Sequence, residues 1–242
     1  LPVLILAGSG NNGADALVCA RLARASGMDV SVMMTSAEGT PECQQALTHY
    51  LAEGGKLLPL EVEPILAAKI IVDGLLGTGV RDAVRDDMAK YIRAINDNSA
   101  WVLSLDLPSG VIADTGAVAG VAVMADITLC FGGVKQGVLT GKARHYSGEL
   151  EFADLGLTPF FTEASAQRVG RETLKDYFAA RARDSHKGQS GKVTVIGGDM
   201  GMAGAVRLAS EACLRAGAGL VTVISRPEHQ LTVNVSRPEL MF

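Results

Sequence analysis

Short apolar runs alternate with stretches of helical spacing along the first two thirds of the chain. The apolar runs have the length of buried strands and lie at residues 3–7, 29–34, 69–72, 101–105 and 127–131. Helices are predicted over residues 15–26, where Gly27 ends the pattern, and over residues 87–96. A strand, a glycine-rich loop, a helix and a strand in this order indicate a parallel pair with a right-handed crossover. The recurrence predicts a Rossmann-like, doubly wound α/β sheet.

The character of the chain changes after Leu157. Thr158-Pro159 breaks the alternation, and residues 162–183 are polar without a sustained strand signal. From Lys192 onward a strand, a glycine-rich loop, a helix and a strand follow again. We therefore expect a first domain with an incomplete N-terminus over residues 1–160, a linker over 161–185, and the truncated start of a second α/β domain over 186–242. Two strands and one helix leave a sheet face uncovered, so residues after about Lys192 should be poorly stabilised by themselves.

Composition and charge narrow the class of partner. The chain carries 22 Lys and Arg against 26 Asp and Glu, without a basic run, which disfavours nucleic acid. Apolar runs stay short of the roughly 18 residues that a membrane span needs, and the four cysteines are scattered without metal-ligand spacing. These features predict a cytoplasmic protein that binds a small molecule, with no nucleic-acid or membrane partner.

The first glycine-rich loop carries a phosphate-binding pattern. Residues 8–13 match GxGxxG between a strand and a helix, where backbone N–H groups can hold phosphate. An ordinary dinucleotide site has an acidic residue at the end of the second strand, but Thr35 and Ser36 occupy that place, which weakens the dehydrogenase interpretation. Asn11 and Asn12 add carboxamide groups that a backbone cradle does not need, although both residues also suit a turn.

Two aspartates follow apolar runs at the same predicted edge of the sheet. Asp73 precedes the loop GLLGTGVR, and Asp106 precedes LPSG. The carboxyl ends of parallel strands are where open α/β sheets bind ligands, although either aspartate alone would also fit a helix cap or a loop hydrogen bond. Pro108 stiffens the turn that presents Asp106 and Ser109. Lys135 and Gln136 lie at the same edge, within reach of a phosphate, but we favour a solvated loop lysine as the interpretation of Lys135.

Several of these segments carry a family resemblance when they are taken together. The first domain contains GNNGAD at residues 10–15, VDGLLGTGVR at 72–81 and LDLPSG at 105–110. The second contains HKGQSGKVTVIGGDMGMAGA at 186–205, RAGAGLVTV at 215–223 and RPELM at 237–241. The sequence thereby resembles the bifunctional NAD(P)H-hydrate repair enzymes of the YjeF family, in which an NAD(P)HX epimerase domain precedes a ribokinase-like NAD(P)H-hydrate dehydratase domain.

The resemblance implies a function in nicotinamide-nucleotide repair. The first domain would epimerise the R and S forms of hydrated NAD(P)H (NAD(P)HX), and the full-length protein would also dehydrate the S form at the expense of ADP or ATP. The late catalytic loop of ribokinase-like proteins does not occur before Phe242, so this chain is expected to perform the epimerisation only. A homo-oligomer is expected. Two alternatives stay open, which are an NAD(P)-dependent dehydrogenase and a non-catalytic nucleotide-binding module.

The resemblance also implies the residues of the site. Nucleotide contacts are expected from Asn11, Asn12, Gly13, Ala14, Asp15, Gly77, Thr78, Gly79, Val80, Arg81, Asp82 and Ala83. Asp106 would face the reacting ring and act as acid and base at its hydroxyl. A potassium ion would be held by Asn12, Asp73 and Ser109 with backbone carbonyls, since oxygen ligands suit such a hard cation. Ala14 and Ala16 stand where the family commonly has glycine, so we expect their methyl groups to crowd a bound phosphate and to affect its affinity. The binding-module alternative rests on the same two residues, as signs of a decayed site.

Overall fold

The computed structural model describes the chain except for residues 1, 162–163, 165, 168, 176, 179 and 236. It divides into two compact units, Leu1–Gln167 and Arg168–Phe242. Among the described residues, none of the helices combines the length and the apolar character that crossing a membrane requires.

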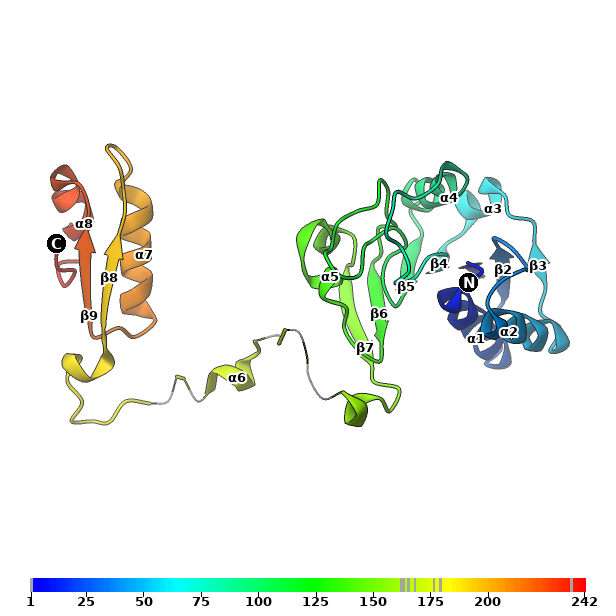
Figure 1. Cartoon of the computed structure of the whole chain (residues 1–242), viewed down its shortest axis with the longest axis horizontal. Coiled ribbons are helices and arrows are strands. Elements are labelled where there is room, and N and C mark those ends of the chain that lie inside the picture. Colours follow the sequence, from blue (N-terminus) through cyan, green and yellow to red (C-terminus); the bar gives the residue numbers. More distant parts are fainter. Residues whose placement is uncertain are drawn as a thin grey trace. The chain divides into compact units, whose positions relative to one another are not determined.

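A parallel sheet in the order β3-β2-β1-β4-β5-β6-β7 forms the centre of the first unit (Figure 1). Its strands are β1 (Val3–Ala7), β2 (Val30–Met34), β3 (Leu57–Leu58), β4 (Ile70–Gly74), β5 (Trp101–Leu105), β6 (Ile127–Phe131) and β7 (Glu149–Ala153). The direction of winding reverses between β1 and β4, which is the switch point of a doubly wound sheet. The predicted fold class is confirmed. The two edge strands, β3 and β7, were not predicted, because β3 is very short and β7 alternates acidic with apolar residues.

Helices cover both faces of this sheet. They are α1 (Asn11–Ala25), α2 (Pro41–Ala52), α3 (Val62–Ala67), α4 (Asp86–Asn96) and α5 (Gln136–Leu139), with short 3-10 turns at Gly141–His145 and Thr158–Phe160. The prediction that the first helix begins at Asp15 was wrong, because the carbonyl of Gly10 already accepts a hydrogen bond of 3.1 Å from Ala14 N–H. Two asparagines and a glycine have low helix propensity, which made this first turn look like loop.

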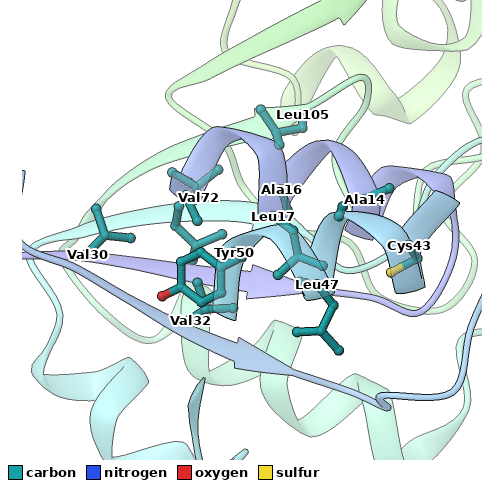
Figure 2. Close-up of a cluster of buried hydrophobic side chains, with 14 of the residues drawn as sticks. Ala14, Ala16, Leu17, Val30, Val32, Cys43, Leu47, Tyr50, Val72 and Leu105 are labelled. Carbon is teal, nitrogen blue, oxygen red and sulfur yellow. The ribbon is translucent and has the colours of Figure 1, made fainter. Parts of the chain in front are cut away.

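Each face of the sheet carries its own apolar core. On one face α1 and α2 pack over β1 and β2, and Figure 2 shows Leu17 and Tyr50 among the buried side chains there. On the other face α3 and α4 pack against Leu4 and Leu6 of β1. Because successive strand residues point to opposite faces, Ile5 belongs to the first core while its two neighbours belong to the second.

The second unit is built on one parallel strand pair. It contains α6 (Arg171–Lys175), β8 (Lys192–Ile196), α7 (Ala203–Arg215), β9 (Leu220–Ile224) and α8 (Gln230–Asn234), with 3-10 turns at Lys187–Ser190 and Pro227–His229. The strand, helix and strand predicted from Lys192 are therefore present. The expected linker over residues 161–185 contains α6, and several of its residues lie outside the described ones.

Candidate active site at the carboxyl edge of the sheet

A cavity of about 920 Å³ opens at the switch point of the sheet. The segment after β1 contributes Ser9, Gly10, Asn11, Asn12, Gly13 and Asp15, and the segment after β4 contributes Leu75, Leu76, Gly77, Thr78, Gly79, Val80, Asp82 and Ala83. Thr35 and Ser36 line it after β2, Asp106 after β5, and Lys90 and Tyr91 on α4. A volume of this order matches the clefts in which proteins bind cofactors and other organic ligands.

Most of the residues expected to contact a nucleotide lie in the wall of this cavity, with Ala14 and Arg81 as exceptions. The Arg81 side chain is exposed, donates to the carbonyl oxygen of Thr78 at 3.1 Å and pairs with Asp114 at 3.5 Å. Asp73 and Ser109, two of the three side chains expected to hold potassium, are fully buried behind the cavity. The roles of all these residues stay predictions at this point.

The methyl groups of Ala14 and Ala16 belong to the buried core that α1 and α2 form over the sheet (Figure 2). Ala16 is fully buried, and a side chain added at Gly74 would meet its Cβ at 2.6 Å. Our expectation that these two methyl groups crowd a bound phosphate is therefore wrong. The pattern GNNGAD marked the loop correctly, but position along a helix decides which side chains face a ligand.

The first loop packs tightly against the start of α1. A Cβ on Gly13 would lie 1.9 Å from the carbonyl oxygen of Gly8, so this position needs glycine for close backbone approach. Gly10 caps α1 without a side-chain hydrogen bond, and the first turn contains no acidic residue. The first N–H groups of α1 therefore point toward the cavity without a side chain that competes for them, which suits an anionic ligand.

Asp73 is held by hydrogen bonds to both carboxylate oxygens. Oδ2 accepts from Ser104 Oγ at 2.8 Å and from Ser109 N–H at 2.9 Å, while Oδ1 accepts from Ser109 Oγ at 2.6 Å and from Leu75 N–H at 3.2 Å. Burial raises the pKa of Asp73, and the hydrogen bonds from Ser109, Ser104 and Leu75 oppose that rise. The buried carboxylate is thus fixed in place beneath the cavity.

Leu76 connects Asn12 to Ser109. The Asn12 Nδ2 group donates to the carbonyl oxygen of Leu76 at 2.9 Å, and Leu76 N–H donates to Ser109 Oγ at 2.8 Å. The other end of the carboxamide, Asn12 Oδ1, is buried without a hydrogen-bond partner. A buried oxygen without a partner is costly and calls for an explanation, such as a ligand that it accepts from or binds.

Asp106 has a strained backbone and an ionic partner. Its φ of 67° lies in the left-handed region that non-glycine residues rarely adopt, and such strain collects at functional sites. Oδ1 accepts from the ammonium group of Lys135 and from Phe131 N–H at 3.2 Å, and Lys135 Nζ also donates to the Phe131 carbonyl at 2.9 Å. The carboxylate is therefore tied to the carboxyl end of β6.

Lys135 was misjudged from the sequence. Its side chain is only 21% exposed and pairs with Asp106, whose side chain is 15% exposed, so it is not a solvated loop lysine. The signal that could have identified it is the place of GGVKQG directly after β6, at the edge where Asp106 follows β5. A lysine at that point can reach a carboxylate on the neighbouring strand, because β5 and β6 are paired in parallel.

Asp15 shares the electrostatic environment of Asp106. Its side chain is exposed to the open cavity, yet the surrounding protein desolvates it enough to raise its pKa. The negative charge of Asp106 raises the pKa of Asp15 further, and the positive charge of Lys135 partly opposes this. The three side chains come from α1, from the segment after β5 and from the segment after β6.

Comparison with known proteins gives two family matches. Residues 2–137 match the family described as "YjeF-related protein N-terminus", and residues 193–242 match "NAD(P)H-hydrate dehydratase". The "Bifunctional NAD(P)H-hydrate repair enzyme Nnr" of Escherichia coli K12 is 41% identical over 98% of this chain and 47% of its own length. The protein of the same name from Coxiella burnetii is 43% identical over 99% of this chain and 50% of its own length.

A relative from Leishmania braziliensis, named "Bifunctional NAD(P)H-hydrate repair enzyme", is 39% identical over 98% of this chain and 45% of its own length. The chain thus spans about half the length of these relatives. The crystal structure of the yeast protein YNL200c matches with a TM-score of 0.53 and 18% identity, over 75% of this chain and 74% of that one. This structural likeness supports the fold.

Proposed function

The chain belongs to the family of YjeF-related N-terminal domains, and on that premise we propose that its first unit is an epimerase for hydrated NAD(P)H. The resemblance read from the motifs is confirmed by the family matches and the relatives. The activity would interconvert the R and S forms of NAD(P)HX. The observation that carries the proposal is the placement of Asp106, strained and ion-paired, in the wall of a cavity at the switch point of the sheet.

The cavity offers donors for the phosphate of such a substrate. The start of α1, which has no side-chain cap, supplies backbone N–H groups, and Gly77, Thr78, Gly79, Val80, Asp82 and Ala83 line the same cavity. Asp106 reaches the cavity from the end of β5, and we propose that it contacts the reacting ring. We propose the nucleotide contacts at residues 11–15 and 77–83 on this basis, with Ala14 and Arg81 outside the cavity wall.

Epimerisation requires proton transfer at one hydroxyl. Hydrated NAD(P)H carries that hydroxyl on the ring carbon next to the ring nitrogen. The nitrogen lone pair can expel it as water once it is protonated, and water then returns to the opposite face of the ring. Asp106 is placed to exchange a proton with this oxygen, and its bonds to Lys135 and Phe131 fix its orientation. Ring opening and closure would use the same carboxylate.

Of the residues expected to hold potassium, Asn12 offers an oxygen without a partner, while both Asp73 oxygens and Ser109 Oγ already accept hydrogen bonds. The Asn12 Oδ1 atom is a buried oxygen without a partner, and it lies on the residue that is linked through Leu76 to Ser109 and so to Asp73. Among the described residues, no cluster of three or more His, Cys, Asp and Glu side chains could hold a metal ion. A site made of one carboxylate and neutral oxygens suits potassium, which would fix these loops and offset phosphate charge.

The second family match concerns the other reaction of the relatives. We propose that the whole protein also dehydrates the S form with ADP or ATP, and that residues 186–242 belong to that dehydratase domain and 161–185 to a linker.

The four cysteines are free in the structure, which supports a reducing compartment such as the cytoplasm.

Two observations weigh against the rival functions, the non-catalytic binding module and the dehydrogenase. The binding-module alternative rested on Ala14 and Ala16 as signs of a decayed site, and both methyl groups lie in the core instead. The dehydrogenase alternative needs an acid at the end of β2, where Thr35 and Ser36 line the cavity. The epimerase is the function that accounts for Asp106, Lys135 and the Asn12 oxygen together.

The test starts from the purified R epimer of NAD(P)HX. Chromatography with and without the protein measures how fast the S epimer appears, and we expect clear acceleration over the spontaneous rate. Asp106→Asn is the matched variant, since the amide keeps the shape but takes no proton. We expect it to abolish turnover while nucleotide binding stays within a few-fold. An unchanged spontaneous rate with the parent protein would overturn the proposal.

A further inference from the structure

Epimerisation by loss and return of a hydroxyl needs two proton-transfer groups. One must protonate the departing hydroxyl, and one must take a proton from the water that arrives on the opposite face. A single carboxylate that serves both steps must reach both faces of the ring. Asp106 supplies one such group, and the second must also lie in the wall of the cavity.

Asp106 is arranged as a proton acceptor. Its Oδ1 atom already accepts hydrogen bonds from the Lys135 ammonium group and from Phe131 N–H. Both groups that bond Oδ1 are hydrogen-bond donors, so this oxygen is placed to accept rather than to donate. A carboxylate that is fixed in this way can take a proton from water, but it is poorly suited to begin the reaction as the donor.

Asp15 is the other carboxyl group with the required placement. It projects from α1 into the cavity that Asp106 enters from the end of β5. The charged groups that act on it are Asp106 and Lys135. On α2, which packs along α1, Glu53 pairs with Arg21 near the far end of both helices, and Asp73 of β4 is enclosed by its own hydrogen bonds.

We infer that Asp15 is the proton donor of the epimerisation and that Asp106, bound by Lys135, is the proton acceptor. This inference rests on the proposed epimerase function and assigns a second catalytic residue to it. The two carboxyl groups differ in environment, since Lys135 pairs with Asp106 while Asp15 faces the open cavity. Paired acids in different environments commonly divide the acid and base roles in this manner.

Every proton and bond in the proposed step is accounted for. The Asp15 carboxyl gives its proton to the hydroxyl, the C–O bond breaks, and water leaves as the nitrogen lone pair forms a C=N bond. A second water attacks the opposite face, a new C–O bond forms, and the π electrons return to nitrogen. The proton of that water goes to Asp106. One proton has moved from Asp15 to Asp106, and exchange with solvent returns both groups to their starting states.

Substrate binding should desolvate Asp15 further. Its side chain loses contact with cavity water when a ligand fills the site, and further desolvation favours the neutral carboxyl that a donor needs. Burial and the charge of Asp106 already raise the pKa of Asp15 in the free protein. The protonated form of Asp15, which is the donor, is therefore present at low pH and disappears as the pH rises through this raised pKa. We expect kcat to fall as the pH rises above that pKa.

The test compares kcat against pH for the 242-residue chain and for Asp15→Asn. We expect Asp15→Asn to lower kcat about 100-fold, within the usual range for loss of one acid or base group. The variant should also lose the fall of kcat at high pH. Asp15→Glu keeps a carboxyl group and should recover part of kcat together with that fall. Direct titration of bound nucleotide should show an affinity within a few-fold of the parent for both variants.

Asp86→Asn is the matched control, because Asp86 is exposed in the first turn of α4 and does not line the cavity. Its pH profile should match that of the parent. If Asp15→Asn keeps both the parent kcat and its fall with pH, the inference is wrong while the epimerase proposal stands. If the parent does not accelerate epimerisation at all, the proposed function fails and the inference fails with it.

Discussion

Ser109 holds both oxygens of the Asp73 carboxylate, with its hydroxyl 2.6 Å from Oδ1 and its N–H group 2.9 Å from Oδ2. Asp73 lies in β4 and Ser109 lies in the segment after the neighbouring strand β5, so this contact ties that segment to β4. The same hydroxyl accepts from Leu76 N–H, whose carbonyl accepts from Asn12. One serine thereby links three segments that carry the predicted ligand residues.

Ser109→Ala should therefore destabilise the first unit. The substitution leaves a buried carboxylate oxygen and the Leu76 N–H without the hydroxyl, at a cost of about 1–3 kcal/mol. Urea unfolding followed by the fluorescence of Trp101 measures this, since the chain has one tryptophan and it lies in β5. Ser26→Ala, at an exposed hydroxyl that donates to Leu22 O, should change the unfolding free energy by less than about 0.5 kcal/mol. Equal effects of the two variants would contradict the role of Ser109.

Potassium should stabilise the first unit through Asn12. The buried Asn12 Oδ1 atom has no partner in the structure, and a bound cation would satisfy it. We expect the Tm of the parent to be higher in potassium chloride than in tetramethylammonium chloride of equal ionic strength, because a ligand that binds only the folded state stabilises it. Asn12→Ala should lose this difference.

The control for the potassium effect is Asn98→Ala. The Asn98 carboxamide bonds the carbonyl oxygens of Ile65 and Ala68, away from the cavity. This variant should lower the Tm in both salts and keep the difference between them. A parent Tm that is the same in both salts would contradict a potassium site here.

The topology and the loops of the site could be predicted from the sequence because they depend on local patterns. Apolar runs and the glycines between them predicted the central strands and a parallel sheet, and the carboxyl-edge rule placed Asp73 and Asp106 at one edge. The grouping of Asn12, Asp73 and Ser109 came from the family resemblance. The hydrogen bonds among these three residues depend on register and on the depth of burial. Such details arise from packing between segments and leave no periodic signal.

Lys135 shows where sequence reasoning failed. A lone lysine in a glycine-rich loop usually points to solvent, and only the parallel pairing of β5 with β6 places it beside Asp106. The prediction of where α1 begins was wrong for a related reason. The propensities of Asn11 and Asn12 favour a loop, but packing on the sheet makes this segment helical. In both cases tertiary contacts outweighed a local preference.

Gly13→Ala should disrupt the first loop more than the addition of one methyl group suggests. A Cβ at Gly13 would lie 1.9 Å from Gly8 O, so α1 or the loop must move, and we expect a loss of more than about 2 kcal/mol. Gly10→Ala is the matched control, because a Cβ there meets no atom within 4 Å and its φ is −95°. Urea unfolding compares the two variants. A Gly13→Ala protein as stable as Gly10→Ala would show that the approach of α1 to the loop is looser than described.

Lys135→Met should act on turnover through Asp106. Without the ammonium group, the Asp106 carboxylate keeps only the 3.2 Å bond from Phe131 N–H and loses its orientation. We expect kcat to fall at least about tenfold, with a smaller change in KM, since Lys135 does not line the cavity. Lys135→Arg should recover part of kcat. Lys142→Met, at an exposed lysine, should behave as the parent does, and a Lys135→Met loss confined to KM would argue for direct substrate binding instead.

The second unit should be less protected than the first when the 242-residue chain is studied by itself. Strand β1 is buried along its whole length and paired with β2 and β4, whereas β8 pairs with β9 and has Ile196 75% exposed. Burial of apolar area, at about 25 cal/mol per Å², is the main term that holds such units together, and α7 covers only part of this strand pair.

Hydrogen exchange with mass measurement tests this difference inside one molecule, with β1 as the internal control. We expect amides of β8 and β9 to exchange well before those of β1, because opening of the small unit exposes them without opening the seven-stranded sheet. The exposed Ile196, Leu208 and Ile224 side chains also give two copies a surface on which to associate, so the measurement is repeated over a dilution series. Protection that falls on dilution would show pairing between copies. Protection of β8 equal to that of β1 at every concentration would show that Val206, Val221 and Val223, the core of this unit, are sufficient to hold it.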